Sequence, residues 1–208
     1  MVEQGVSVER CAFSGSSAGS IAACLLVCGC DMRAVLEHAI ATGADRFACR
    51  TEAATHLEGM LRSTLELFLP EDAAARCSNG HLNVFMYRVG SGHYFKSEFA
   101  SRGQLIESVL ASAHLPFYSN GSFSFRIGGD AHVDSECYVA GERSAVMTCR
   151  VNARSRVLID YHDDAKMPGD AVWYRAGTPD MWRARFERGK EFALERRHLL
   201  PCAPRQTQ

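Results

Sequence analysis

Gly15, Ser17 and Gly19 form the pattern G-x-S-x-G, which is typical of a nucleophilic serine at a sharp turn between a strand and a helix. A short apolar stretch, residues 11–13, precedes the pattern, and an apolar, Ala-rich run, residues 21–27, follows it. The backbone of such a turn is strained and crowded, so the two glycines would supply the room that it needs. The pattern predicts Ser17 as a nucleophile; the alternative is a Gly/Ser-rich loop that only caps a helix.

Ala18 is placed to assist this chemistry. The helix after Ser17 would direct its N-terminus at the site, where the helix dipole favours negative charge. The backbone N–H of Ala18 could then donate to the oxyanion that develops on an ester carbonyl. The same short segment thus offers a nucleophile and a candidate oxyanion donor.

A nucleophilic serine needs a general base, which is usually a histidine. The chain has eight histidines, and none lies in an obvious catalytic loop beside a carboxylate. We interpret them as ordinary surface or half-buried histidines. His132, which is followed by Val133 and Asp134, is the strongest candidate among them.

The nine cysteines predict buried thiols rather than a metal site. Cys24, Cys28 and Cys30 lie in an apolar helical run, where a free cysteine behaves as a small hydrophobe. Cys28 and Cys30 have no second Cys or Cys/His pair at zinc-finger spacing. An odd number of cysteines in this setting indicates a reduced, intracellular protein.

Composition and charge narrow the class of protein. The 208 residues, 47% of them hydrophobic, suit one ordinary globular domain. A net charge of −1 gives no basic excess for binding nucleic acid. The longest apolar stretch, residues 21–30, is shorter than a membrane span, and no secretory signal opens the chain. We therefore expect an intracellular, cytoplasmic protein without a transmembrane helix.

Hydrophobic periodicity predicts an α/β fold. Asp31 is a plausible N-cap for a helix that Gly43 would end, and Ser101 for a later helix that stops before Pro116. Further helices are expected at residues 53–68 and 180–197. Two hairpins are expected, residues 82–89 with 93–99 and residues 123–127 with 131–133, and single strands at 145–151 and 156–161.

Several segments together resemble the patatin-like phospholipases, in their animal-type, adiponutrin-like branch. Residues 11–23 (CAFSGSSAGSIAA) resemble the family's nucleophile elbow. Residues 80–89 (GHLNVFMYRV) and 97–118 (SEFASRGQLIESVLASAHLPFY) resemble its hairpin and the helix that follows. The helix over residues 178–194 is also similar, so the resemblance covers about residues 5–197.

The resemblance implies a three-layer α/β/α fold and a serine acyl hydrolase with a Ser–Asp dyad and no catalytic histidine. The sequence has no recognisable metal site or nucleotide-binding loop, so we expect no cofactor. Ser17 would be the nucleophile. The family's aspartate lies in an Asp-Gly motif, which is absent after the second hairpin here. Asp134, after an apolar residue, is preferred over Asp130, which we place in the hairpin turn. Ser135 stands where the family has glycine and could hydrogen-bond the aspartate or crowd the substrate.

The resemblance also implies a lipid ester as substrate, in a glycerolipid or phospholipid at a membrane or lipid-droplet surface. The family's glycine-rich oxyanion loop lies well upstream of the elbow, whereas only sixteen residues precede Ser17. We therefore expect a partial patatin-like domain over residues 1–198 and a flexible tail over 199–208. A catalytically inactive or truncated protein that binds lipid or a partner protein is the alternative.

Overall fold

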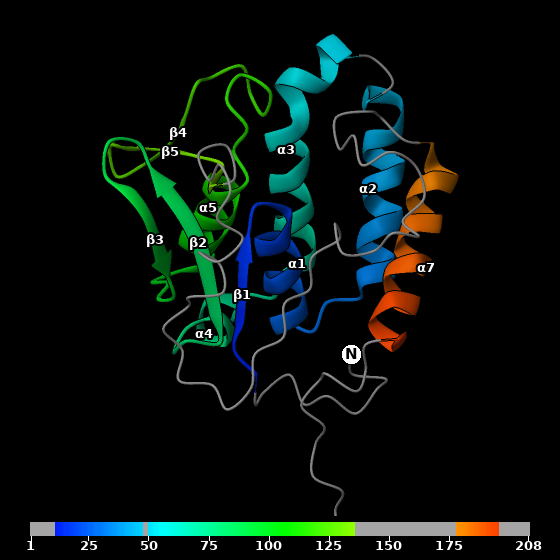
Figure 1. The fold of residues 1–208 in the computed structure, drawn as a ribbon, viewed down its shortest axis with the longest axis horizontal. Helices are drawn as coiled ribbons and strands as arrows, with labels where there is room; N and C mark the ends of the chain where they lie inside the picture. Colours follow the sequence, from blue (N-terminus) through cyan, green and yellow to red (C-terminus); the bar gives the residue numbers. More distant parts are fainter. Residues whose placement is uncertain (1–10, 48–49, 136–177, 196–208) are drawn as a thin grey trace, which may run out of the picture. The chain divides into compact units, whose positions relative to one another are not determined.

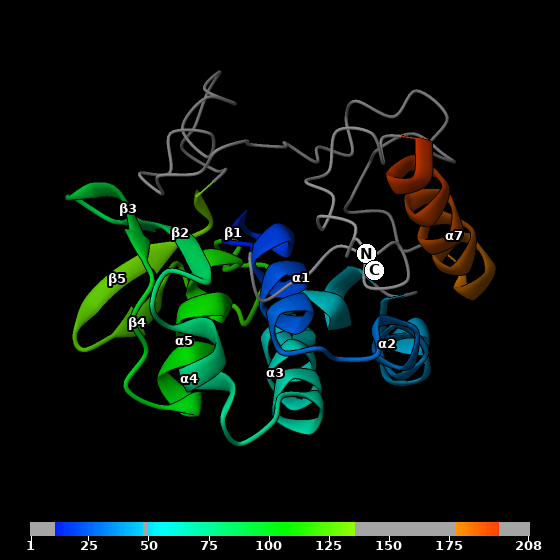
Figure 2. The ribbon, with the colours of Figure 1, turned by 90° about the horizontal axis from the view of Figure 1, so that it is seen from below.

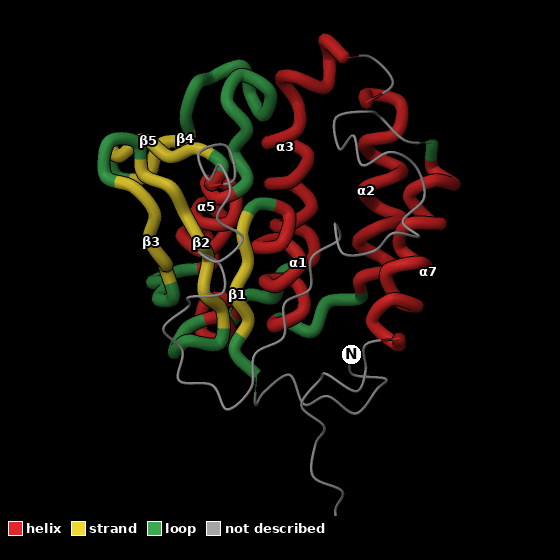
Figure 3. The backbone as a smooth tube through the Cα atoms, viewed as in Figure 1, coloured by secondary structure: helices red, strands yellow, loops and turns green. Residues whose placement is uncertain are grey.

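The computed structural model describes residues 11–47, 50–135 and 178–195 of the chain. The chain divides into two compact units, residues 12–151 and residues 1–11 with 152–208. The first unit contains the described strands and all described helices except α7, as Figures 1 and 3 show. Its elements in chain order are β1 (Phe13–Ser16), α1 (Ala18–Val27), α2 (Met32–Phe47), α3 (Arg50–Phe68), α4 (Ala73–Cys77), β2 (Leu82–Arg88), β3 (Gly92–Lys96), α5 (Arg102–Ser112), β4 (Phe125–Ile127) and β5 (Asp130–Val133).

The strand β2 organises the mixed sheet. It pairs with β1 in parallel and with β3 and β5 antiparallel, and β4 extends the sheet beyond β5. Phe85 pairs with both β1 and β3, and Tyr87 pairs with both β3 and β5. The strands β1 and β5 therefore share one edge of β2, and β3 occupies the other edge.

Helices α1, α4 and α5 lie on one face of this sheet (Figure 2). Leu82, Val84 and Met86 alternate along β2 and are fully buried in the core beneath the helices. The same core contains Leu25 of α1 and Leu105 of α5. The α/β class predicted from periodicity is confirmed. Of the two helical layers expected in an α/β/α fold, the described residues show the one that contains α1, α4 and α5.

The predicted helix caps are confirmed. Asp31 Oδ1 accepts hydrogen bonds from the backbone N–H of Arg33 at 2.9 Å and of Ala34 at 3.2 Å. Ser101 Oγ accepts from the N–H of Gln104 at 3.1 Å, at the start of α5. Both side chains satisfy donors that a helix N-terminus leaves unpaired.

Other helix predictions need correction. Gly43 does not end α2, which continues to Phe47, because glycine lowers helix stability without breaking the backbone hydrogen bonds as proline does. The short helix α4 was not predicted, since five residues give too little hydrophobic periodicity. The predicted hairpins are present, although β3 ends at Lys96 and β4 begins at Phe125.

The second unit contains the helix α7 (Pro179–Glu195), close to the predicted residues 180–197. Thr178 begins it, since its carbonyl accepts from the N–H of Trp182 at 3.1 Å and its Oγ1 from the N–H of Met181 at 3.3 Å. The strands predicted at residues 145–151 and 156–161 lie outside the described residues.

Candidate active site

Ser17 occupies a strained turn between β1 and α1. Its φ is 52° and its ψ −129°, a conformation that residues with a side chain rarely adopt. Gly15 makes the turn possible, because a Cβ at this position would lie 2.4 Å from the carbonyl oxygen of Gly19. A Cβ on Gly19 itself would meet nothing within 4 Å. We predicted that both glycines are needed to relieve crowding. This holds for Gly15, whereas the position of a Cβ on Gly19 is open.

The sheet topology brings Ser17 and Asp134 together. Ser16, the last residue of β1, is in register with Phe85 of β2, and Val133, the last residue of β5, with Tyr87. Because β1 and β5 run toward each other along the same edge of β2, the residues that follow them meet. Ser17 Oγ donates a hydrogen bond to Asp134 Oδ2 at 2.5 Å, across 117 positions of sequence.

Asp134 is deeply buried, whereas Ser17 is partly exposed. Asp134 has 1% of its surface exposed, and its backbone N–H donates to the carbonyl of His114 at 2.7 Å. This bond anchors the end of β5 to the segment after α5. The arrangement holds a buried carboxylate against the hydroxyl of a partly exposed residue.

Asp130, the alternative aspartate, lies elsewhere. It is the first residue of β5 rather than part of the turn, which Gly128 and Gly129 make with positive φ values. Its side chain is 51% exposed and forms an ion pair with Arg88 at 3.4 Å. Our placement of Asp130 in the turn was therefore wrong, because strand pairing begins immediately after the second glycine.

Buried serines hold the turn in place. Ser112, the last residue of α5, accepts a hydrogen bond from the N–H of Ser17 at 3.1 Å and donates to the carbonyl of Phe85 at 2.7 Å. Ser16 is the last residue of β1, and Ser135 directly follows Asp134. Their hydroxyls share a hydrogen bond of 2.5 Å. Side-chain hydrogen bonds thus tie the end of β1 to the segment after β5, and the turn at Ser17 to the end of α5.

Comparison with known proteins now adds to this geometry. A family model described as "Patatin-like phospholipase" matches residues 12–145, more than half of the chain. The chain belongs to this family. The resemblance that the elbow and the central segments carry is confirmed.

Two animal relatives match the patatin-like chain. The omega-hydroxyceramide transacylase of Homo sapiens is 33% identical over 110 residues, which cover 51% of this chain and 20% of that protein. The omega-hydroxyceramide transacylase of Mus musculus is 34% identical over 110 residues, covering 51% of this chain and 18% of its own length. The chain therefore spans about a fifth of the curated relatives it matches.

The start of α1 offers an oxyanion donor in this patatin-like unit. The backbone N–H groups of the first helical turn have no acceptor within the helix, and Ala18 is the first residue of α1. Ala18 is an exposed residue. The N–H of Ser17 already donates to Ser112. Ala18 is thus the better placed of these two amides.

The hydrogen bond from Ser17 reaches Asp134 directly, and the buried histidines have other hydrogen-bond partners. His132 is buried, and its Nε2 shares a hydrogen bond with the hydroxyl of Tyr94 at 2.9 Å. Burial lowers the pKa of both His132 and His114. His132 and His114 have only 2% and 1% of their surface exposed, so they are buried rather than the surface or half-buried histidines that we expected.

Two residues of the site gave weak or no signals in the sequence. Ser112 belongs to an ordinary amphipathic helix, and only its place near a helix end and before His114 set it apart. Ser135 was expected beside the aspartate, but the hydroxyl of Ser16 is its hydrogen-bond partner.

No described helix is long and apolar enough to cross a membrane.

Proposed function

We propose that this patatin-like chain is a serine acyl hydrolase that cleaves lipid ester bonds through a dyad of Ser17 and Asp134. The observation that carries the proposal is the hydrogen bond that Ser17 Oγ, at the strained turn, donates to the buried Asp134. A nucleophile in contact with a positioned acceptor is the arrangement that nucleophilic catalysis requires. Asp130, exposed and paired with Arg88, has no such contact with Ser17 among the described residues.

The proposed reaction has two half-reactions. Ser17 Oγ attacks the ester carbonyl while Asp134 takes its proton, and the N–H of Ala18 donates to the oxyanion. The proton then passes to the leaving alcohol, and an acyl-serine remains on the protein. Water, deprotonated by Asp134, attacks this acyl-serine and releases the carboxylic acid. Aspartate and serine return to their starting protonation states.

The family supports a lipid substrate. Membership of the patatin-like phospholipases favours glycerolipid or phospholipid esters, which reside in membranes and lipid droplets. We therefore propose that the protein works at the surface of such a lipid phase, as a peripheral enzyme without a bound cofactor.

Acyl transfer to an alcohol is the second candidate function. The two relatives are named transacylases, and an acyl-serine can be attacked by a lipid hydroxyl in place of water. Both candidates share the first half-reaction and differ only in the acceptor. A long-chain alcohol added to the assay distinguishes them, since transfer yields a new ester and hydrolysis yields free acid.

The test combines covalent labelling with turnover. We expect a fluorophosphonate probe to label Ser17, identified by peptide mass spectrometry, and the chain to hydrolyse a short-chain p-nitrophenyl ester. Ser17→Ala should abolish both, and Asp134→Asn should lower turnover by about 100-fold or more, the scale of lost acid–base catalysis. Ser14→Ala and Asp130→Asn are the matched controls and should retain activity.

Folded protein without labelling or turnover would contradict the proposal and support the inactive, lipid- or partner-binding alternative. Loss of activity in Asp130→Asn with retention in Asp134→Asn would reverse the assignment of the base. Circular dichroism of each variant verifies that the fold is retained.

A further inference from the structure

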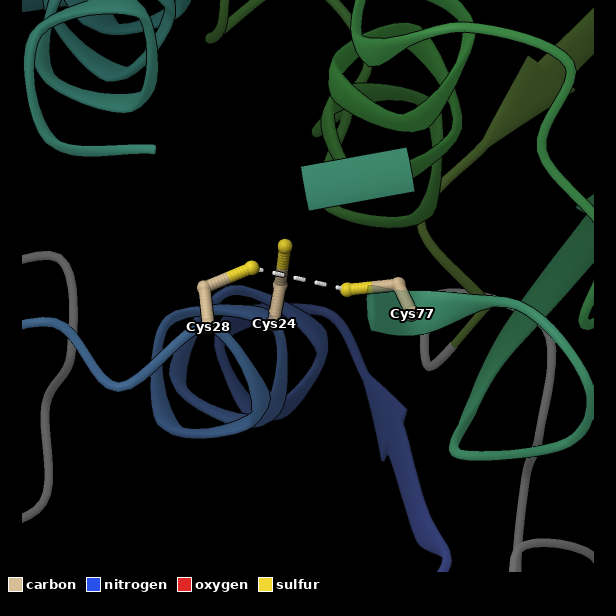
Figure 4. Close-up of side chains that lie close together, drawn as sticks. All are labelled: Cys24, Cys28 and Cys77. Atoms are coloured by element: carbon tan, nitrogen blue, oxygen red, sulfur yellow. Dashed lines mark hydrogen bonds between the residues drawn. The ribbon is translucent and has the colours of Figure 1, made fainter. Parts of the chain in front are cut away.

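Three cysteines from two helices meet in the core, away from Ser17 and Asp134. Cys24 and Cys28 lie one turn apart on α1 and at its C-cap, and Cys77 is the last residue of α4 (Figure 4). Their three sulfur atoms lie within 4.8 Å of one another. The Sγ atoms of Cys28 and Cys77 are 3.7 Å apart. We call these three residues the thiol cluster.

The thiol cluster is enclosed by the core. Cys24 and Cys77 have no exposed surface, and Cys28 has 5%. All three are free thiols. Burial alone is ordinary for cysteine, which packs as a small hydrophobe. Apolar packing does not, however, require three sulfur atoms to converge from segments almost fifty positions apart.

The spacing of the sulfurs suits a shared metal ion. A metal–sulfur bond is about 2.3 Å long, so two sulfurs on one ion lie about 3.8 Å apart in tetrahedral geometry and about 4.0 Å in trigonal geometry. The 3.7 Å between Cys28 and Cys77 is close to both values, and the 4.8 Å limit on the others leaves a small adjustment. Three ligand atoms are thus nearly in place before any ion binds.

A cationic side chain lies beside the thiol cluster. Arg76 Nη1 donates to the carbonyl of Cys28 at 3.2 Å, and Nε of the same guanidinium forms an ion pair with Asp72 at 2.9 Å. Thiolate is the form of cysteine that binds metals.

We propose that Cys24, Cys28 and Cys77 form a three-thiolate site for a soft monovalent ion, Cu(I). Thiolate ligands select soft ions such as Cu(I). Structural Zn²⁺ takes four ligands, and the described residues place three cysteines and no fourth His, Cys, Asp or Glu ligand in the cluster. Each bound thiol releases one proton to solvent, so the loaded site carries a charge of −2 that Arg76 partly offsets.

The site would join α1 to α4. The helix α1 begins directly after Ser17, and α4 leads into β2, which sets the register of both β1 and β5. A bound ion would stabilise the folded state, because the unfolded chain does not hold the three sulfurs together. Its role is structural and separate from the proposed acyl chemistry.

The test is an anaerobic titration of the full chain with Cu(I) in competition with bathocuproine disulfonate. The background is a variant in which five other cysteines are replaced by serine, namely Cys11, Cys49, Cys137, Cys149 and Cys202. We expect it to withdraw one equivalent of Cu(I) per chain. Cys28→Ala and Cys77→Ala in that background should lose this equivalent, and the matched control Cys30→Ala should retain it.

Cys30 is a sharp control because its thiol donates to the carbonyl of Phe68 at 3.3 Å rather than joining the cluster. Equal Cu(I) binding in Cys77→Ala and its parent would overturn the proposal, as would loss of binding in Cys30→Ala. A second measurement does not depend on the folding of these variants. It is X-ray absorption of the Cu(I)-loaded protein that retains Cys24, Cys28 and Cys77. Sulfur neighbours alone support the site, and nitrogen or oxygen neighbours contradict it.

Discussion

The hydroxyl of Ser112 connects the proposed nucleophile to the centre of the sheet. It donates to the carbonyl of Phe85 and accepts from the N–H of Ser17, so one buried side chain satisfies two backbone groups. Ser17 needs such support, because its backbone is held at a positive φ that costs on the order of 1–3 kcal/mol. In the proposed reaction Ser112 is therefore a positioning residue, not a group that touches the ester.

Ser112→Ala should lower kcat by about 10- to 100-fold with little change in KM, because the turn loses its anchor and Ser17 Oγ shifts. It should also cost about 1–3 kcal/mol in the free energy of unfolding, since two buried backbone groups lose their partner. Steady-state hydrolysis of a p-nitrophenyl ester and urea unfolding measure the two effects.

Ser108→Ala is the matched control for Ser112→Ala. Ser108 is equally buried on the same helix, one turn earlier, and its Oγ donates to the carbonyl of Gln104 within α5. It should retain kcat. A loss of kcat of the same size in both variants would contradict the positioning role and indicate general damage to α5.

Local sequence patterns predict Ser17 as a nucleophile, but they cannot predict the residues that hold it in position. G-x-S-x-G with apolar flanks specifies a turn, because every residue of the pattern lies within that turn. Ser112 and Asp134 reach the same place through the pairing of distant segments, about which a local pattern holds no information. The choice between Asp134 and Asp130 came from family resemblance, and their contrasting surroundings became visible only through the register of β5 on β2.

At the scale of elements, β1 and the first turn of α1 approach each other so closely that one position excludes any side chain. A Cβ at Gly15 would come within 2.4–2.6 Å of backbone atoms of Gly19 and Ser20. Backbone cannot move aside as a flexible side chain can. The contact therefore sets the angle at which the chain enters α1 after Ser17.

Gly15→Ala should lower the free energy of unfolding by about 3 kcal/mol, the upper range for overpacking, or prevent folding. Gly19→Ala, the matched control four residues on, should change it by less than about 1 kcal/mol in the stabilising direction, because alanine favours helix and meets no neighbour. Urea unfolding followed by circular dichroism compares them. Equal destabilisation by both changes would show that the approach of β1 to α1 is not the constraint.

Elements with strong local signals were predicted well. Asp31 and Ser101 cap helices as expected, because an N-cap acts on N–H groups two or three residues away. Gly43 misled the prediction of the end of α2, since glycine at a helix end has the same local appearance as a tolerated glycine within a helix. Cys77 could not be linked to Cys24 and Cys28, because only the packing of α4 against α1 brings it near.

At the scale of the whole molecule, buried histidines make stability depend on pH. Burial lowers the pKa of His114 below its usual 6.5, and Nδ1 of this ring has no hydrogen-bond partner among the described residues. Below pH 6.5 the unfolded chain takes up a proton that the folded chain does not. The free energy of unfolding should therefore decrease as pH falls from about 6.5 toward the folded-state pKa.

His114→Gln should flatten this dependence, by at most about 1.4 kcal/mol per pH unit, the value for one proton. His132, whose pKa burial also lowers, should retain its own part of the slope in this variant. Urea unfolding at pH 7.5, 6.5 and 5.5 measures how the free energy of unfolding depends on pH in each variant. His81→Gln, at a partly exposed position, is the control and should keep the full slope. An unchanged slope in His114→Gln would contradict the assignment.

The meeting of β1 and β5 on one edge of β2 has a consequence for the order of folding. Ser17 and Asp134 are 117 positions apart, so their contact requires closure of one of the longest loops in this unit. Helices such as α3 depend on local contacts and form early, and chains of this size often populate partly folded intermediates. During refolding from urea, helical circular dichroism should return before Ser17 becomes reactive toward a fluorophosphonate. Simultaneous recovery of the two signals would contradict this order. A lag would make the contact between Ser17 and Asp134 a reporter of the last step in completing the sheet.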